Sequence, residues 1–479
     1  MKQRVVILLL SVSNLINAQF AGHIDPAMGF VNNVTFAKEG RDIKQLSNGH
    51  IIVSGSLWSS PSYDGYLMEF DSNGNFITGS QETGTTCFFA CDTIDSNNYI
   101  AVGRSENFTN HIIFDKKTLA YSSVDIDLSS LFNRIDVFDL VTQPDGKFVI
   151  CGLSSTDGLV NKFWVARFNS NLTIDNTFGS NGHVSLAFGN DAQARSIALQ
   201  TDGKIVAVGH SITNKNAVIV RLNTNGTLDN SFFGSGYTIT QSEINYSELY
   251  GVAVANDNTI YSVGVRKGAG NAEGQIRVIN PTQNQFIYTA TTNAKWYSIS
   301  LQADSSKLII SGQSSPSLFG ATVPLVYRFR MDGTGAYVND PSFNGFNNLG
   351  LYTTGIVGSY NQDFTMSNCI QTDGKILLSG VFNGGMFLTR LENDYIPTGK
   401  NEFLSDKQDL KSYPNPSNGI FNVTNTKNIK TIKAYNLIGK EVEIIQQSEN
   451  TFQIHEKGLY ILHVQTRDGK ICTEQVIIN

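Results

Sequence analysis

The sequence has little charge, little proline and few cysteines. Of its 479 residues, 16% are charged, 10 are proline and 5 are cysteine, and no cluster of lysine and arginine occurs. This composition excludes a collagen, a coiled coil and a largely disordered chain. The missing basic cluster argues against nucleic acid as a partner.

The cysteines make a poor disulfide framework because their number is odd. Cys87 and Cys91 are close enough in sequence to bridge locally in an oxidising compartment. Cys151 and Cys369 lie within apolar strand patterns, and we expect them to be buried thiols.

Long apolar segments are also missing, apart from one near the N-terminus. Residues 1–18 begin with Lys2 and Arg4, continue with an apolar run over 5–10, and offer Ala18 as the small residue before a cleavage site. The apolar run is shorter than the roughly 20 residues of a membrane-spanning helix. We therefore predict a cleaved secretory signal peptide over residues 1–18, with a membrane anchor as the alternative.

What the sequence does contain is a repeat, and one copy runs from residue 196 to residue 232. Self-similarity of this kind is typical of solenoids and propellers. The markers of this copy are Asp202, Gly203, Lys204, Gly209, Arg221, Asp229 and Phe232. Two other copies show the same order, with Asp145, Gly146, Lys147, Gly152, Arg167, Asp175 and Phe178, and with Asp373, Gly374, Lys375, Gly380 and Arg390.

A glycine that closes the second strand of each copy marks the period. Seven copies average about 54 residues, close to the roughly 40–50 residues of a four-stranded propeller blade. Asp-Gly and Asn-Gly pairs supply the positive φ of tight hairpins, and the strands are apolar on both faces, as in stacked sheets. The glycines are Gly55, Gly103, Gly152, Gly209, Gly264, Gly312 and Gly380.

The two ends of the repeat array complement each other. Several copies finish with an Asp-x-x-Phe segment, the last copy lacks one after Arg390, and the similar segment Asp25-Pro-Ala-Met28 precedes the first copy. We predict that residues about 22–30 supply the outer strand of the seventh blade, which removes an open sheet edge. The predicted fold is therefore an all-β, seven-bladed β-propeller of four-stranded blades over residues 19–395, with a β-solenoid as the alternative.

An arginine recurs in the third strand of the copies. These arginines could form a ring of anion-binding groups, or each could pair with the aspartate of its own copy. Because a half-buried guanidinium needs a carboxylate partner, we favour ion pairs. The arginines are Arg167, Arg221, Arg277, Arg328 and Arg390. The predicted pairs are Arg167–Asp175, Arg221–Asp229 and Arg390–Asp25.

This pattern resembles the delta-60 repeat family of secreted bacterial proteins over roughly residues 22–395. The resemblance implies a β-propeller-like array and no catalytic activity.

The composition changes after Leu391. Residues 396–411 are polar and indicate a linker, and residues 412–479 contain short strands typical of a small Ig-like β-sandwich. Three motifs follow in order, at residues 413–416, 434–442 and 458–464: Tyr-Pro-Asn-Pro, Ala-Tyr-Asn-Leu-Ile-Gly-Lys-Glu-Val and Gly-Leu-Tyr-Ile-Leu-His-Val.

These three motifs resemble the type A C-terminal sorting domain of the type IX secretion system of the Bacteroidetes. The resemblance implies recognition by the type IX machinery and export across the outer membrane. It also implies removal of the domain and attachment to surface lipopolysaccharide. An ordinary Ig-like domain is the alternative.

Motifs for catalysis or cofactor binding are missing. The sequence has no H-E-x-x-H, no G-x-S-x-G and no P-loop, and its 7 histidines form no close pair with zinc spacing. The glycine cluster over 264–270 opens no helix and predicts no nucleotide site. The segment Asp71-Ser-Asn73-Gly-Asn75 resembles part of a calcium loop without its glutamate, and we predict a turn. We expect no catalytic residue, no metal and no cofactor.

Candidate binding residues enter the first strand of each copy. They are large aromatic or arginine side chains around a channel mouth, which suits protein hot spots or sugar stacking. The aligned residues are Arg41, Phe89, Phe138, Arg195, Tyr250, Tyr297 and Met366, with Trp58, Arg104, His210 and Trp296 on the same rim. The predicted binding site comprises Arg41, Trp58, Phe138, Arg195, His210, Tyr250 and Tyr297. The alternative is that these side chains only pack between blades.

The sequence favours a secreted or cell-surface binding protein without catalytic activity, built on a rigid scaffold whose loops carry recognition. Its expected partners are an extracellular glycan, another protein or the cell's own surface polymer, besides the secretion machinery. One alternative is a glycan hydrolase or lyase, which needs two carboxylates roughly 5–9 Å apart across a cleft. Another is a structural surface-layer component, which would have no concave pocket.

Overall fold

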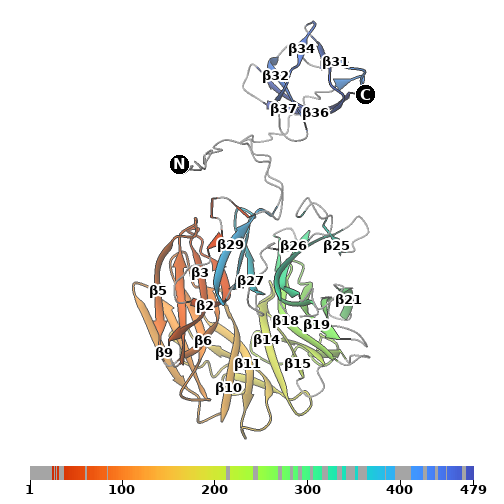
Figure 1. The fold of residues 1–479 in the computed structure, drawn as a ribbon. Helices are drawn as coiled ribbons and strands as arrows, with labels where there is room; N and C mark the ends of the chain where they lie inside the picture. The colour runs from red at the N-terminus through yellow and green to blue at the C-terminus, as the bar shows by residue number, and fades with distance from the viewer. Residues whose placement is uncertain are drawn as a thin grey trace, which may run out of the picture. The chain divides into compact units, whose positions relative to one another are not determined.

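The computed structural model forms two compact units, one spanning Phe20–Tyr395 and one containing Ile396–Asn479. All the secondary-structure elements among the described residues are β-strands (Figure 1). Among the described residues, no helix is long and apolar enough to cross a membrane. The signal peptide predicted over 1–18 and the linker predicted over 396–411 lie outside the residues that the structure describes. The described residues are 24–25, 27–28, 30–31, 37–59, 62–83, 85–211, 216–240, 246–267, 272–280, 284–289, 294–302, 306–314, 322–331, 337–340, 343, 351–353, 364–382, 384–393, 412–423, 429–436, 441–448, 450–466 and 471–478.

The described strands of the first unit form seven antiparallel sheets in which consecutive strands are hydrogen-bonded neighbours. The first three sheets are β2 (Ala37–Gln45), β3 (Ile51–Ser59), β4 (Ser62–Phe70) and β5 (Phe76–Glu82); β6 (Thr85–Thr93), β7 (Tyr99–Ser105), β8 (His111–Lys117) and β9 (Tyr121–Asp127); and β10 (Arg134–Thr142), β11 (Phe148–Ser155), β12 (Lys162–Phe168) and β13 (His183–Leu186). The next three are β14 (Ala192–Leu199), β15 (Ile205–Ser211), β16 (Ala217–Leu222) and β17 (Tyr237–Thr240); β18 (Tyr246–Val254), β19 (Ile260–Lys267), β20 (Ala272–Ile279) and β21 (Asn284–Thr289); and β22 (Ala294–Leu301), β23 (Lys307–Ser314), β24 (Val323–Met331), β25 (Tyr337–Asn339) and β26 (Leu351–Thr353). The last consists of β27 (Phe364–Ile370), β28 (Ile376–Phe382), β29 (Gly385–Leu391) and β1 (Phe30–Val31).

The first strands of these sheets form a closed ring. They contact one another in the order β2, β6, β10, β14, β18, β22 and β27, and β27 contacts β2 again (Figure 1). Alternate residues of a strand pack against opposite neighbours: Phe148 and Ile150 belong to the core shared with the preceding sheet, and Val149 and Cys151 to the core shared with the next. This arrangement explains why the strands are apolar on both faces.

The N-terminal segment completes the last sheet. Phe30 pairs with Thr389, and Ile24 forms a bridge with Leu391. The backbone N–H of Asp25 donates to the carbonyl of Arg390 at 2.8 Å. The segment therefore supplies the fourth strand of this sheet, as the complementary ends of the repeat array indicate.

The predicted arginine–aspartate pairs are present. Arg167 Nε lies 2.8 Å from Asp175, Arg221 Nε lies 2.8 Å from Asp229, and Arg390 lies 2.7 Å from Asp25. Arg328 makes the same contact with Asp340 at 2.8 Å. Arg277 donates to the side chains of Gln275 and Asn284, at 3.1 and 3.3 Å.

The lysine and phenylalanine of the repeat join these pairs. Lys147, Lys204 and Lys375 reach the same aspartates, at 2.9, 3.1 and 2.6 Å. The guanidinium groups of Arg167, Arg221 and Arg328 lie 4.7, 4.6 and 4.9 Å from the ring centroids of Phe178, Phe232 and Phe343. The repeat markers therefore meet in one structural cluster in these sheets.

A β-bulge interrupts the first strand of every sheet in the first unit. In β10, Val137 pairs with Gly152 and Asp139 with Cys151, so Phe138 has no partner across the strands. A side chain at position 152 would overlap the carbonyl oxygen of Asp136, which explains the glycine. The same relation holds between the six other repeat glycines and the bulges at Arg41, Phe89, Arg195, Tyr250, Tyr297 and Met366.

Cys87 and Cys91 do not form the local bridge considered above, because both are free and buried. They lie four residues apart on β6, and at about 3.3 Å per residue an extended strand separates them by about 13 Å. A disulfide needs Cα atoms within about 7 Å. Cys151 is fully buried and Cys369 is partly buried, and both are free thiols.

The second unit is a pair of four-stranded sheets around its own core. One consists of β30 (Ser412–Tyr413), β31 (Ile420–Val423), β35 (Thr451–Gln453) and β34 (Ile445–Gln446). The other consists of β33 (Glu441–Val442), β32 (Ile429–Asn436), β36 (Gly458–Thr466) and β37 (Ile471–Ile478). Phe421 and Phe452 from the first sheet pack with Tyr460 and Leu462 from the second.

Candidate functional site

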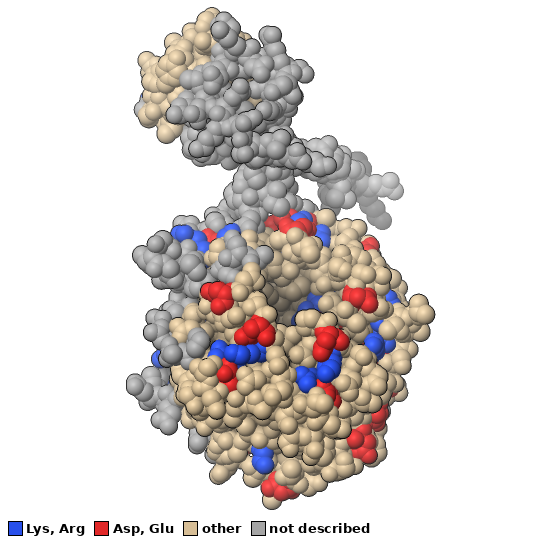
Figure 2. Space-filling view, turned by 180° about the vertical axis from the view of Figure 1, so that it is seen from behind, with Lys and Arg blue, Asp and Glu red and all other residues tan. Residues whose placement is uncertain are grey.

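The seven bulge residues line a single cavity of about 550 Å³. Each sheet contributes one of them, and each is partly exposed. The face of this unit is hollowed at its centre, with basic atoms inside the hollow and acidic residues around it (Figure 2). We call these residues the channel ring: Arg41, Phe89, Phe138, Arg195, Tyr250, Tyr297 and Met366.

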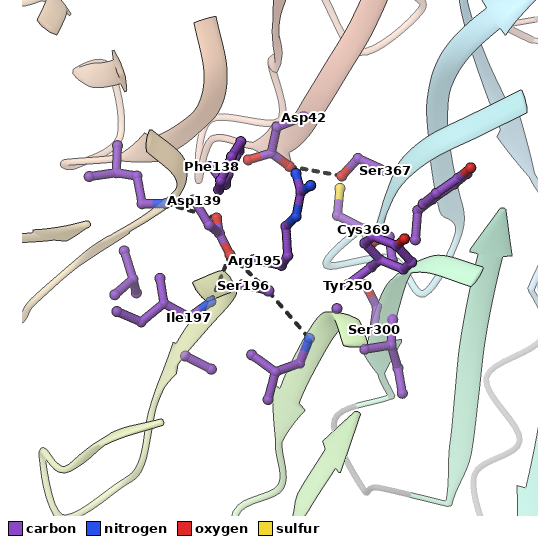
Figure 3. Close-up of a pocket in the computed structure, with 18 of the residues that line it drawn as sticks. Asp42, Phe138, Asp139, Arg195, Ser196, Ile197, Tyr250, Ser300, Ser367 and Cys369 are labelled. Atoms are coloured by element: carbon purple, nitrogen blue, oxygen red, sulfur yellow. Dashed lines mark hydrogen bonds between the residues drawn. The ribbon is translucent and has the colours of Figure 1, made fainter. Parts of the chain in front are cut away.

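Neighbouring members of the channel ring touch one another. The Arg41 guanidinium lies 5.6 Å from the Phe89 ring centroid, and Phe89 packs edge-on against Phe138 at 6.0 Å. Arg195 lies 4.1 Å from the Phe138 centroid and 5.9 Å from that of Tyr250 (Figure 3). Tyr250 packs against Tyr297 at 5.5 Å. The cavity wall at this level is therefore a nearly continuous band of rings and guanidinium groups.

The two arginines of the channel ring have different partners. Arg41 Nη2 lies 2.8 Å from Glu39. Burial alone would lower the pKa of Arg41, but neighbouring Cys87 and Glu39 raise it. Among the described residues, no carboxylate lies within ion-pair distance of Arg195, and burial lowers its pKa. Both groups remain cationic at neutral pH because guanidinium loses its proton only in strong base.

The two tyrosines are held by hydrogen bonds. Tyr250 Oη donates to Glu248 at 2.5 Å, and Tyr297 Oη donates to Gln313 at 3.1 Å. Burial raises the pKa of both phenols, that of Tyr297 to about 12. Both are therefore neutral at physiological pH, with rings fixed along the cavity wall.

An acidic layer also lines the cavity, comprising Asp42, Asp92 and Asp139 with Lys44 among them. Lys44 Nζ donates to both carboxylate oxygens of Asp42 at 2.9 Å. Burial alone would lower the pKa of Lys44, but Asp42 and the other carboxylates raise it. Burial, with the charge of Asp42, raises the pKa of Asp139 to about 6.

The carboxylates of this layer join neighbouring sheets. Asp42 accepts from Ser367 Oγ of β27 at 2.8 Å and from the backbone of Cys91 in β6 at 3.1 Å. Asp139 accepts from Ser196 Oγ and the Ile197 backbone of β14, at 2.8 and 2.9 Å (Figure 3). Asp92 accepts from the backbone of Thr142 at 2.6 Å. These contacts indicate a structural role for the acidic layer.

Five of the seven residues in the predicted binding site lie in the channel ring: Arg41, Phe138, Arg195, Tyr250 and Tyr297. His210 is 4% exposed and lies behind the ring, with its imidazole 5.9 Å from the Tyr250 ring. The side chain of Trp58 lies outside the described residues. Of the other rim candidates, Trp296 is fully buried in the core and Arg104 binds Asp136 at 2.5 Å.

Sequence reasoning missed the acidic layer. Asp42 and Asp139 directly follow channel-ring residues, and Asp92 follows Phe89 by three positions. The signal that could have revealed this layer is the acidic residue that recurs shortly after the aligned channel-ring position.

The segment that resembles a calcium loop forms the predicted turn. Asp71 accepts hydrogen bonds from the backbone N–H groups of Asn73 and Asn75, both at 2.8 Å. The side-chain hydrogen bond from Asn75 is the main reason that the pKa of Asp71 is lowered. Within the described part of the chain, no group of three His, Cys, Asp or Glu residues is arranged to hold a metal ion.

Two family models match parts of the chain. Residues 143–178 and 200–232 match a β-propeller domain described as a domain of unknown function (DUF5122). Residues 411–479 match the secretion system C-terminal sorting domain. No curated protein matches the chain.

Solved structures show a similar fold at low identity. Hydrazine synthase of Kuenenia stuttgartiensis is 10% identical, with a TM-score of 0.50, over 76% of this chain and 98% of that chain. A catalytically inactive virginiamycin B lyase from Staphylococcus aureus, solved with quinupristin, is 12% identical, with a TM-score of 0.48, over 76% and 98%. Sqt1 from Chaetomium thermophilum is 11% identical, with a TM-score of 0.45, over 74% and 81%. At these identities the likeness concerns the fold alone.

The propeller match and the strand topology confirm the predicted all-β propeller class. The match over 411–479 confirms the predicted sorting domain. A type IX sorting tail implies the secretion machinery as a partner and export to the cell surface or beyond it. The chain therefore carries a DUF5122 β-propeller domain followed by a type IX C-terminal sorting domain.

Proposed function

We propose that residues 20–395 are a non-catalytic binding module, displayed on the cell surface or secreted, and that the channel ring holds its extracellular ligand. In this proposal, residues 1–18 act as the signal peptide for the first membrane. The sorting domain then directs export and is removed, and the module is released or attached to surface lipopolysaccharide.

The observation that carries the proposal is the convergence of seven bulge residues on one cavity. Six of the seven are aromatic or arginine, the residue types that dominate binding hot spots and sugar-stacking surfaces. The volume of about 550 Å³ lies in the range of small-ligand sites. Rings held by the strands of a closed sheet array lose little side-chain entropy when a ligand binds.

The acidic layer supports a non-catalytic role. Asp42 is engaged by Lys44, Ser367 and two backbone N–H groups, and Asp139 by Ser196 and two backbone N–H groups. A general acid or base must be able to exchange its proton with the substrate, and these oxygens are already used to join sheets.

One observation favours a glycan hydrolase or lyase as the second candidate. Asp139 has a pKa of about 6 and lines the same cavity as Asp42, and a raised pKa beside a second carboxylate is typical of an acid–base pair. The third candidate, a purely structural surface-layer component, needs no concave pocket, and a cavity lined by aromatic and arginine side chains does not support it.

The test is a binding screen of the purified full chain against glycans and surface proteins, followed by isothermal titration of the hits. Arg195→Ala and Tyr297→Ala should each weaken binding by about tenfold or more, because each removes a channel-ring contact. Phe76→Ala is the matched control, since Phe76 is 57% exposed on β5 and is not among the residues that line the cavity.

Unchanged binding in both ring variants would place the ligand elsewhere and refute the proposal. Hits should also be incubated with the chain and examined for cleavage. Turnover that Asp139→Asn abolishes would establish the catalytic alternative instead.

A further inference from the structure

We infer that the ligand of the channel ring carries a single carboxylate on a pyranose ring, the chemistry of an acidic sugar residue. This inference rests on the proposed binding function and deepens it, because it names the ligand class. Its central group is Arg195.

Arg195 lacks the counter-ion that Arg41, the other arginine of the channel ring, has two residues before it. The residue two positions before the bulge is acidic in three sheets, as Glu39, Asp136 and Glu248. It is the neutral Gln193 in the fourth sheet, and it is Cys87, Lys295 and Phe364 in the remaining three. Glu39 pairs with Arg41 at 2.8 Å. In the fourth sheet the corresponding carboxylate is missing, and no other described carboxylate comes within ion-pair distance of Arg195.

Gln193 satisfies only part of the guanidinium. With its amide oriented to suit its neighbours, the Gln193 oxygen accepts from Arg195 Nη2 at 3.0 Å and Nε at 3.2 Å, and also from His210 at 2.7 Å. A guanidinium has five N–H donors, and one neutral oxygen cannot balance its charge. A partly buried cation without a paired anion is under-stabilised, so a ligand carboxylate would gain a charge-assisted, fork-shaped contact here.

The surroundings of Arg195 favour a carboxylate borne on a ring that has an apolar face. The guanidinium lies over Phe138 at 4.1 Å, and Tyr250 and Tyr297 continue the wall on its other side. The apolar faces of pyranose rings stack on such aromatic walls. A sugar ring could therefore lie against the tyrosines while its carboxylate meets Arg195.

The acidic layer limits the ligand to one anionic group. Asp42, Asp92 and Asp139 line the same cavity, with Lys44 as the cation among them. They would repel a second negative charge. The acceptor sites that Asp92 and Asp139 keep beside their bonds within the protein can receive hydroxyl groups. This arrangement orients a hydroxylated acid, with its carboxylate at the channel ring and hydroxyls toward the acidic layer, and disfavours polyphosphates.

The test is isothermal titration of the full chain with galacturonate, which carries one carboxylate, and with its methyl ester, which has the same ring without the charge. We expect the acid to bind at least about tenfold more tightly than the ester. Arg195→Gln should abolish this preference, and Arg195→Lys should retain part of it. Arg330→Gln is the control, because Arg330 is exposed on β24 and is not among the residues that line the cavity.

Equal affinity for acid and ester, with Phe138→Ala weakening both, would overturn this inference while the binding function stands. The inference also fails if wild-type chain binds neither form, or if Arg195→Gln keeps both its melting temperature and its preference for the acid. No binding in the wider glycan and protein screen would instead refute the proposed function itself.

Discussion

At the scale of single residues, the lysine, arginine and phenylalanine of the repeat are explained by one cluster around its buried aspartate. Asp229 is 6% exposed and accepts from Arg221 at 2.8 Å, from Lys204 and from Ser231 at 2.7 Å, while Phe232 lies beneath the guanidinium. These residues are far apart in the sequence motif but share one buried site. Their recurrence therefore reflects folding rather than ligand binding.

Acid should destabilise the first unit between about pH 4 and pH 2. Burial alone would raise the pKa of Asp229, but hydrogen bonds from Ser231 and Lys204 lower it to about 2, and the pKa values of Asp25 and Asp175 are lowered as well. Because the unfolded chain binds these protons more tightly, with a pKa near 3.9, stability is lost as pH falls through this window. Melting temperatures measured by circular dichroism from pH 7 to pH 2 test this.

Asp229→Asn should lower the melting temperature at pH 7 and flatten its fall below pH 4. Asp202→Asn is the matched control, because the Asp202 side chain is 44% exposed and lies 3.6 Å from Lys204. An acid profile of Asp229→Asn identical to that of the unmodified chain would contradict the explanation.

At the scale of elements, the β-bulge is the feature that turns a repeat into a site. It adds one residue to the first strand of each sheet and directs that residue's side chain to the cavity. The flanking residues Val137 and Ala194 are fully buried, whereas Phe138 and Arg195 are partly exposed. In a regular strand, side chains alternate strictly between the two faces of the sheet, and no additional residue is inserted to face the cavity.

Gly152→Ala should destabilise the chain by about 3 kcal/mol, because the added methyl group overlaps the Asp136 carbonyl and the bulge cannot form unchanged. Gly385→Ala is the control. The nearest atoms to a Cβ at Gly385 lie 3.8 Å away, so the change should stay within about 0.5 kcal/mol. Urea unfolding measures both, and equal stabilities would show that the glycine is not required by the bulge.

At the scale of the whole molecule, residues far apart in sequence close the array. Asp25 accepts from Arg390 and Lys375, and Arg390 also donates to the carbonyl of Ser72 in the first sheet at 2.7 Å. Ser367 and Asp42 join the last sheet to the first at the channel. Closure thus depends on contacts at the cavity and at the outer strand.

Deleting residues 24–31 should lower the melting temperature of the first unit by about 5 °C. The deletion removes β1 and leaves Arg390 and Lys375 without Asp25, and an unpaired buried charge is costly. Removing residues 412–479 should leave that transition unchanged, because the second unit has its own core. Differential scanning calorimetry distinguishes the two, and a deletion without effect would argue against closure by the N-terminal segment.

Much of the fold follows from local patterns. Asp-Gly turns such as Asp202-Gly203, with φ +81° at Gly203, set hairpins through short-range backbone geometry. The period of the repeat and the unmatched Asp25 segment indicate the ring of sheets. The pairs Arg167–Asp175 and Arg221–Asp229 were predictable because their spacing recurs within each copy.

The candidate site was only partly predictable. Alignment of the copies located the channel ring, since equivalent positions in a closed array face the same axis. It misplaced His210 and Trp296, which are buried behind or between sheets, because sequence position near a strand end does not specify the direction of a side chain. It also overlooked the acidic layer, whose carboxylates are recognised by their inter-sheet hydrogen bonds.

The sequence by itself determined the strands, the turns, the repeat, the closing segment and the sorting tail, because each of these is encoded by local composition and spacing. Only the tertiary structure decided which side chains share the cavity and which of them are neutralised. Those outcomes depend on bulges and on ring closure, which bring residues of seven sheets to one axis and leave Arg195 there without a carboxylate partner among the described residues.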